Sequence, residues 1–144
     1  MEPKTLRILI VEDTPERQEI LRNLFRDHAW ILVHTADRAI CLLNAYDFDL
    51  ISLDFDLAGI KRGDEVALAI SHSRNAKTKV IIHSMNPLGA ERIMALLPHA
   101  NHVPISKMTK NNRIFKRLRQ ELLKGVDIDW AFVFRRDRLS NQQK

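Results

Sequence analysis

Polar residues that can bind metals or phosphate follow the apolar, strand-like runs of this 144-residue chain. Six of them stand at such run ends: Glu12, Asp13, Asp54, Asp56, Ser84 and Lys107. Crowded carboxylates repel one another, which raises their pKa values unless a cation neutralises them. Hard oxygen ligands with open positions suit Mg²⁺, which also takes phosphate oxygens from a substrate. The set therefore predicts a divalent-metal site that handles a phosphoryl group.

Within this set, Asp54 is the predicted phosphoryl-bearing centre, because an aspartate can form an acyl phosphate. Lys107 and Ser84 are expected to contact the remaining phosphoryl oxygens, since phosphoryl transfer depends on positioning and on charge neutralisation. Each residue alone has an ordinary explanation, because every strand must end in something polar. The argument therefore depends on the whole set lying at one edge of a sheet.

Five short apolar runs are expected to be strands, at residues 6–11, 30–33, 50–53, 80–83 and 102–106. Between them lie segments with helical spacing. The first of these helices is expected to have Thr14 as its N-cap and Pro15 at its first position. Further helices are expected at 36–45, 64–72, 89–97 and 111–124. This alternation predicts an α/β fold with a doubly wound parallel sheet, whose ligand site lies at the carboxyl ends of the strands.

Composition narrows the class of protein. The length fits one domain, and a single cysteine, Cys41, excludes an internal disulfide; its apolar neighbours favour a core position. A reducing cytoplasm fits this composition. No long apolar segment stands near the N-terminus, so neither export nor a membrane anchor is expected.

The net charge of +5 is unevenly distributed. From Lys107 onward, eleven Lys and Arg residues face four acidic residues. This basic C-terminal third makes nucleic acid a candidate partner, although a charge run on a helix is more often a solvated face. Residues 126–134 alternate partly like an extra strand, and residues 135–144 form a polar basic tail.

Several motifs carry a resemblance to a known family. The segments 7–15, 49–54 and 63–67, followed by Ser84 and Lys107, resemble the receiver domain of two-component response regulators over about residues 5–124. The resemblance implies a flavodoxin-like (βα)5 fold with a five-stranded sheet in the order 2-1-3-4-5. The receiver-like domain would then occupy residues 1–125, and residues 126–144 would be a C-terminal extension.

The same resemblance implies roles for the site residues. Glu12, Asp13 and Asp54 would hold Mg²⁺, together with the backbone carbonyl of Asp56. Asp54 would accept a phosphoryl group from a histidine kinase or a small phosphodonor, and Ser84 and Lys107 would contact it. A downstream protein partner would then read the phosphorylated state.

Three positions depart from the receiver pattern. Met85 replaces a small residue after Ser84, Met108 replaces the proline after the lysine, and Pro104 replaces the aromatic residue of the fifth strand. The absence of that aromatic residue argues against the usual rotamer switch. Met85 would narrow the entrance to Asp54.

An alternative comes from the segments 53–57 and 83–92, which are similar to a divergent receiver offshoot proposed to process cyclic phosphates. In this second hypothesis Asp54 and Asp56 act as nucleophile and general acid/base in a metal-dependent phosphoesterase. His83, Met85 and Asn86 would then contact the substrate, although a lone histidine beside a sheet is more often a packed one. A third hypothesis is an interaction module that works without phosphorylation.

Overall fold

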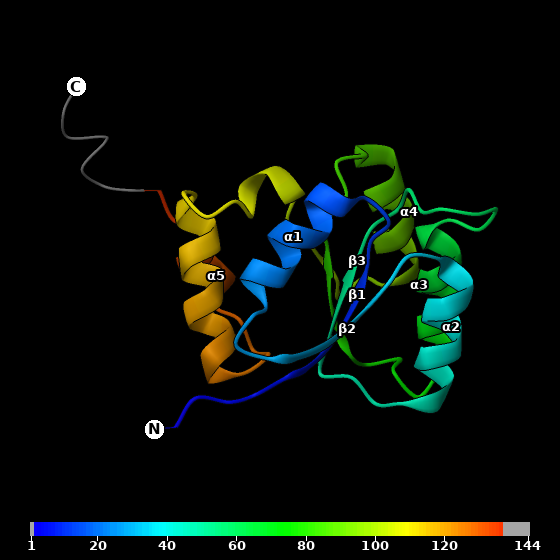
Figure 1. Cartoon of the computed structure of the whole chain (residues 1–144), viewed down its shortest axis with the longest axis horizontal. Helices are drawn as coiled ribbons and strands as arrows, with labels where there is room; N and C mark the ends of the chain where they lie inside the picture. The colour runs from blue at the N-terminus through cyan, green and yellow to red at the C-terminus, as the bar shows by residue number, and fades with distance from the viewer. Residues whose placement is uncertain (1, 137–144) are drawn as a thin grey trace.

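A parallel sheet of five strands runs through the centre of the computed structural model, which describes residues 2–136 (Figure 1). The order is β2-β1-β3-β4-β5, which confirms the flavodoxin-like prediction. The strands are β1 (Arg7–Val11), β2 (Ala29–Val33), β3 (Leu50–Leu53), β4 (Lys79–Ile82) and β5 (Asn101–His102).

Helices cover both faces of the sheet (Figure 1). On one side, α1 (Pro15–Leu24) and α5 (Arg113–Lys124) bury an apolar cluster that includes Leu21 and Leu118. On the other side lie α2 (Ala36–Ala45), α3 (Gly63–Ser71) and α4 (Pro87–Leu96), whose cluster includes Val66 and Ile93. The sheet is therefore buried between two apolar layers.

The strand register brings the chemistry-bearing residues to one edge. Val11 pairs with Leu53, and Leu53 pairs in turn with Ile82. The residues that follow these three positions are therefore neighbours at the carboxyl edge of the sheet. They are Glu12, Asp54 and His83.

The start of α1 agrees with the prediction, with Thr14 at the N-cap and Pro15 at the first helical position. The Thr14 side chain makes no capping hydrogen bond to the helix. Its hydroxyl instead donates to Asp13 Oδ1 at 3.4 Å. Proline can occupy this position because the first helical N–H groups have no partner within the helix.

The fifth strand is shorter than predicted. The strand ends at His102, and the 3₁₀ helix η1 (Ile105–Lys107) occupies the end of the expected run 102–106. Val103 and Ile105 still donate backbone N–H groups to β4 and the residue after it. Pro104 between them has no N–H to donate, and the chain turns there into η1.

The expected extra strand at 126–134 is wrong, because the structure has the short helix α6 (Trp130–Phe134) in this segment. Asp129 caps it by accepting a hydrogen bond from the Phe132 N–H at 3.1 Å, and Val133 is fully buried against the α5 side of the core. Of the predicted basic tail, residues 137–144 lie outside the described residues.

Two further expectations concern exposure and the membrane. Cys41 is exposed and not a core residue, because the buried side of α2 is formed by Ala36, Ala39 and Leu43. No helix within residues 2–136 has the length and apolar character needed to span a membrane.

Candidate functional site

Four buried polar residues lie at the carboxyl edge of the sheet. Glu12 follows β1, Asp54 follows β3, and His83 and Ser84 follow β4. None of the four is more than 1% exposed. Buried polar groups are costly unless they are paired, so each contact around them is informative.

Glu12 is held by three contacts. Its Oε2 accepts the Thr14 N–H at 3.0 Å, and its Oε1 lies 2.9 Å from His83 Nε2. Its backbone carbonyl accepts a hydrogen bond from Gln18 Nε2 at 2.9 Å. Burial by itself raises the pKa of Glu12, but the hydrogen bond and charge of His83, with the Thr14 N–H, outweigh burial and lower it. Glu12 is therefore an anchored carboxylate.

His83 connects Glu12 to the middle of the sheet. Its Nδ1 lies 2.8 Å from the hydroxyl oxygen of Ser52, and its Nε2 contacts the Glu12 carboxylate. Because an ionised carboxylate can only accept, the N–H at His83 Nε2 donates a hydrogen bond to Glu12 Oε1. The ring is fully buried, so the structure places His83 behind the carboxylates.

Asp54 is the least satisfied member of the site. Its Oδ1 accepts the Phe55 N–H at 2.8 Å, whereas its buried Oδ2 has no hydrogen-bond partner in the described part of the chain. The nearest cationic group is Arg17, whose Nη1 lies 3.7 Å from Oδ2. Burial is the main cause that raises the pKa of Asp54 to about 6; the Glu12 charge adds to the rise, and His83, Phe55 N–H and Arg17 oppose it.

The donor set fits a divalent cation. Glu12, Asp54 and His83 each offer a ligand atom, and these atoms lie within 4.8 Å of one another. His83 already donates to Glu12, so the carboxylate oxygens are the better ligands. Half-buried Asp13, whose Oδ1 accepts the Thr14 hydroxyl, is not one of these three residues. The unpartnered Asp54 Oδ2 is an open acceptor that either a hard cation such as Mg²⁺ or a phosphoryl group would occupy.

The loop after β4 forms one wall of the site. Ser84 Oγ accepts the Asn86 N–H at 3.0 Å, and the Ser84 carbonyl accepts a hydrogen bond from His102 Nε2 at 2.8 Å. Asn86 caps α4 by accepting the Gly89 N–H, and its Nδ2 lies 3.4 Å from the exposed Asp56 carboxylate. The structure thus connects Asn86 with Asp56 at the rim.

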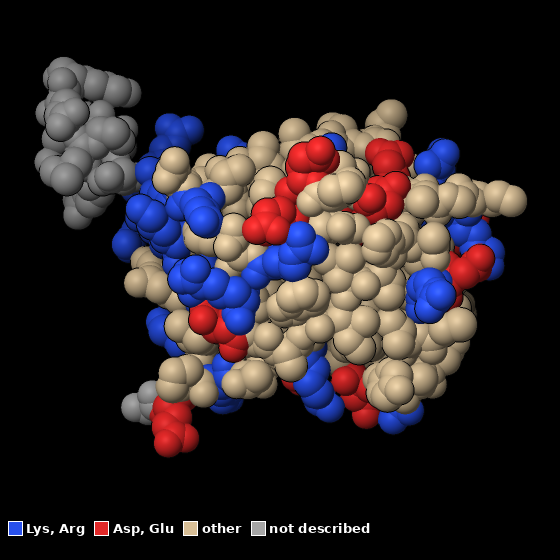
Figure 2. Space-filling view, in the orientation of Figure 1, with Lys and Arg blue, Asp and Glu red and all other residues tan. Residues whose placement is uncertain are grey.

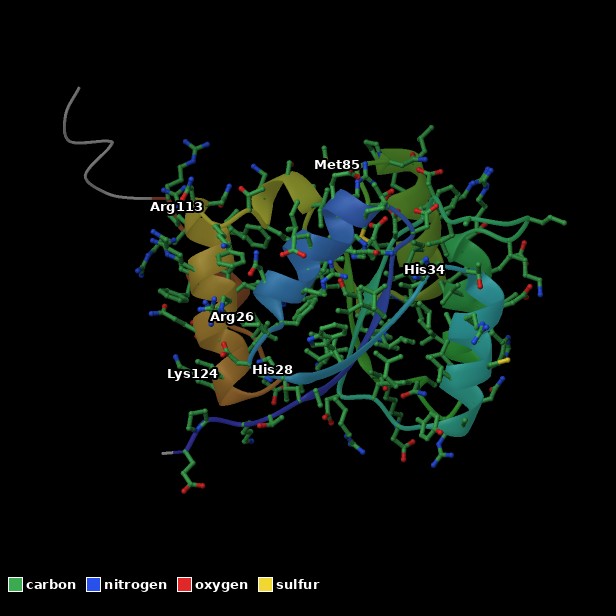
Figure 3. All side chains as sticks on the ribbon, in the orientation of Figure 1. Arg26, His28, His34, Met85, Arg113 and Lys124 are labelled. Atoms are coloured by element: carbon green, nitrogen blue, oxygen red, sulfur yellow. The ribbon has the colours of Figure 1, made fainter. Side chains whose placement is uncertain are left out.

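Met85 lies on the outside of this loop. It is 47% exposed, and Figure 3 shows it between the N-terminal ends of α1 and α4. The predicted contacts of Met85 and Asn86 with a substrate stay predictions.

Two glycines allow the loops to pack closely around Asp54. A Cβ added at Gly63 would lie 2.2 Å from the backbone oxygen of Asp54. A Cβ added at Gly89 would lie 2.3 Å from the Phe55 ring. The Gly63 N–H also donates to the Phe55 carbonyl at 2.7 Å. Both positions need the absence of a side chain because of this close approach.

The structure does not bring every predicted residue together. Lys107 lies in η1, is exposed, and forms no ion pair or hydrogen bond through its side chain within residues 2–136. Arg17 occupies the position next to Asp54 instead, and the sequence-based prediction missed it. The sequence did contain one indication of this contact. Arg17 stands four residues after Asp13, in the first turn of the helix that starts beside the site.

Comparison with protein families identifies the chain. A model of the cyclic-phosphate processing receiver domain matches residues 7–99, which is more than half of the chain. The chain belongs to this receiver family. Among curated proteins, no relative matches it.

Solved receiver structures share the fold. The response regulator TrrA from Thermotoga maritima, in complex with Mg²⁺ and BeF, is 21% identical with a TM-score of 0.62, covering 82% of this chain and 96% of its own. The response regulator domain of T. maritima CheB is 20% identical with a TM-score of 0.62, and the match covers 88% and 99%. The Mn²⁺-bound response regulator Rcp1 is 24% identical with a TM-score of 0.59, covering 85% and 98%. At these identities the likeness establishes the receiver fold.

Proposed function

We propose that this receiver domain is a phosphoacceptor module in which Asp54 takes a phosphoryl group with the help of Mg²⁺. The observation that carries the proposal is the buried Asp54 Oδ2, which lacks a hydrogen-bond partner among the described residues and belongs to a carboxylate that lies beside Glu12 and His83. A buried acceptor without a partner costs stability. A cation or a phosphoryl group bound at this oxygen would relieve that cost.

The transfer would be an in-line displacement at phosphorus. An Asp54 carboxylate oxygen forms the new P–O bond, while the bond between phosphorus and the donor breaks and the leaving group keeps its electron pair. With acetyl phosphate the leaving group is acetate, and with a phosphohistidine donor it is the imidazole. Mg²⁺, when bound by Glu12, Asp13, Asp54 and the Asp56 carbonyl, would neutralise charge on the phosphoryl oxygens.

Ser84 is the residue that would transmit the phosphorylation of Asp54 to the rest of the domain. Its hydroxyl is now used by the Asn86 N–H, and its carbonyl is connected to β5 through His102. A turn of Ser84 toward the phosphoryl group would alter both contacts. A protein partner that binds near α4 or β5 could then distinguish the two states.

Adduct formation tests this proposal. With Mg²⁺ and beryllofluoride or acetyl phosphate, we expect a one-to-one adduct in intact-mass and NMR measurements. Asp54→Asn should abolish it, whereas Asp64→Asn, at a half-buried carboxylate in the first turn of α3 that accepts the Glu65 N–H, should leave it intact. Absence of any adduct over a full titration of Mg²⁺ would rule out the phosphoacceptor function.

A second function is metal-dependent turnover of a cyclic phosphate. The observation in its favour is the buried Glu12–His83 pair beside Asp54, together with the description of the matched family. In this function Asp54 is the nucleophile and Asp56 supplies the general acid/base. Metal-dependent hydrolysis of a 2′,3′-cyclic nucleotide that Asp56→Asn removes would support it.

The two functions differ in the lifetime of the adduct. A stable Asp54 acyl phosphate indicates signalling, while rapid turnover of a cyclic phosphate indicates catalysis. If neither an adduct nor turnover is found, the domain is an interaction module that works without phosphorylation.

A basic face on α5 supports a further proposed contact, with nucleic acid. Figure 2 shows Lys and Arg side chains gathered over α5. Arg113 and Lys116 of this helix are exposed, as is Lys110 in the turn before it. Phosphate contacts of this kind weaken steeply with salt. Binding of a single-stranded RNA that falls with salt, and that Arg113→Gln with Lys116→Gln removes, would support the contact.

A further inference from the structure

Arg17 lies where a cation can serve the phosphoryl centre. It is the third residue of α1, the helix that begins at Pro15 immediately beyond the end of β1. Side chains on a helix lean back toward its N-terminus, which here is the direction of the strand ends. Its Nη1 accordingly reaches 3.7 Å from the Asp54 Oδ2.

The burial of the two partners fits a bound anion. The Asp54 side chain is 1% exposed, whereas the Arg17 side chain is 32% exposed. Asp54 thus lies at the bottom of the site, and Arg17 closes it from the solvent side. A group attached to Asp54 Oδ2 would extend toward the guanidinium.

The contact in the present state leaves room for such a group. At 3.7 Å the Arg17–Asp54 pair is longer than a hydrogen bond, which agrees with Oδ2 having no partner in the described structure. A phosphoryl group would place its oxygens beyond Oδ2. The planar guanidinium fork can donate two hydrogen bonds to such oxygens, which suits phosphate recognition.

Among residues 2–136, no other Lys or Arg lies within ion-pair distance of Asp54. Arg22, one turn and a half further along α1, pairs with Glu19. Lys107, the lysine expected from the receiver pattern, is exposed and has no ion pair in the described region. Pro104 and the turn into η1 separate it from the regular end of β5.

We infer that Arg17, and not Lys107, is the cation that binds the phosphoryl group carried by Asp54. This inference rests on the proposed phosphoacceptor function. The positive charge that neutralises the phosphoryl group then comes from the first turn of α1 and not from η1.

Beryllofluoride binding in the presence of Mg²⁺ tests the inference in the full chain. We expect Arg17→Gln to weaken the apparent affinity about tenfold or more, since a charge-assisted hydrogen bond is lost. Lys107→Gln and the same-helix control Arg22→Gln should stay within about twofold of the unchanged protein. Arg17→Lys should recover part of the loss, because it restores the charge without the fork.

A second measurement separates direct contact from a structural effect. The side-chain Nε–H signal of Arg17 in a ¹⁵N-resolved NMR spectrum should shift on addition of beryllofluoride, and that of Arg22 should not. Urea unfolding of each variant controls for folding.

The outcomes distinguish the inference from the function on which it rests. An adduct in the unchanged protein that Arg17→Gln leaves intact and Lys107→Gln abolishes would overturn the assignment of Arg17 alone. No adduct in the unchanged protein would overturn the phosphoacceptor function and the inference with it.

Discussion

His83 Nε2 lies 2.9 Å from Glu12 Oε1, and both side chains are fully buried. The pair crosses the end of β3, because β3 lies between the strands that precede Glu12 and His83. Ser52 on β3 completes the chain of hydrogen bonds through His83 Nδ1. Three neighbouring strands are thereby connected directly behind Asp54, which fixes the carboxylate positions before any ligand arrives.

Loss of His83 should destabilise the protein strongly. His83→Gln removes one partner of a buried pair and leaves the Glu12 carboxylate uncompensated, so we expect a loss of about 3–5 kcal/mol in the free energy of unfolding. Ser52→Ala removes a single neutral hydrogen bond and should cost about 1 kcal/mol. Urea unfolding followed by circular dichroism measures both. Equal stabilities for the two variants would contradict the central role of the pair.

Asp54 should make the metal-free protein less stable as the pH rises. Its folded-state pKa, about 6, lies above the ordinary value of 3.8, so the protonated form is favoured in the folded state. The stability that this proton provides is complete below about pH 3.8 and is lost as the pH rises to 6 and beyond. Asp54→Asn should therefore stabilise the metal-free protein at pH 7.5, by roughly 2–3 kcal/mol.

Thermal unfolding in EDTA at several pH values compares the stability of Asp54→Asn with that of the unchanged protein. The difference in stability should nearly vanish at pH 3.5. Addition of Mg²⁺ at pH 7.5 should raise the melting temperature of the unchanged protein more than that of the variant. If Asp54→Asn is less stable than the unchanged protein at pH 7.5 without metal, the ionised Asp54 carboxylate does not destabilise the folded state.

Much of the fold follows from local sequence patterns. The central strands are continuous apolar runs, and such runs between helical segments predict a parallel sheet whatever the details of the loops. The prediction failed where side chains set local geometry, as with Pro104 at the end of β5 and Asp129 as the N-cap of α6. A five-residue helix has too few turns for its period to be distinguished from strand alternation.

The proximity of Glu12 and Asp54 could be predicted from the sequence, but the contact of Arg17 with Asp54 could not. Strand ends bring Glu12 and Asp54 together in any sheet of this order, so their proximity follows from topology. The position of Lys107 depends on the path of the chain after β5, which the sequence pattern does not specify. Arg17 was missed because a charged residue in the first turn of a helix is usually solvated, and only the structure shows that it reaches Asp54.

The glycine at position 89 should be required for packing against Phe55. Gly89→Ala places a Cβ 2.3 Å from the ring, and we expect a loss of about 1–3 kcal/mol in stability. In a Phe55→Ala background the penalty of Gly89→Ala should fall but not vanish, because the two ring atoms that the new Cβ meets are removed while Phe55 Cβ, at 2.8 Å, remains. Gly63→Ala meets backbone atoms of Asp54 and Phe55, so its penalty should persist in that background. A double-mutant cycle with urea unfolding measures these couplings; equal Gly89→Ala penalties in both backgrounds would contradict the packing argument.

The C-terminal helix α6 should unfold together with the domain because a buried carboxylate connects it to α5. Glu121 is 5% exposed, and its Oε1 accepts the Asp129 N–H at 2.9 Å at the start of α6. Glu121→Ala leaves that N–H without its partner, so we expect a loss of about 1–3 kcal/mol, with faster hydrogen exchange at Val133. The exposed neighbour Gln120→Ala should change neither. Exchange at Val133 that is already as fast as in an unfolded peptide before any substitution would show that α6 opens independently of the receiver core.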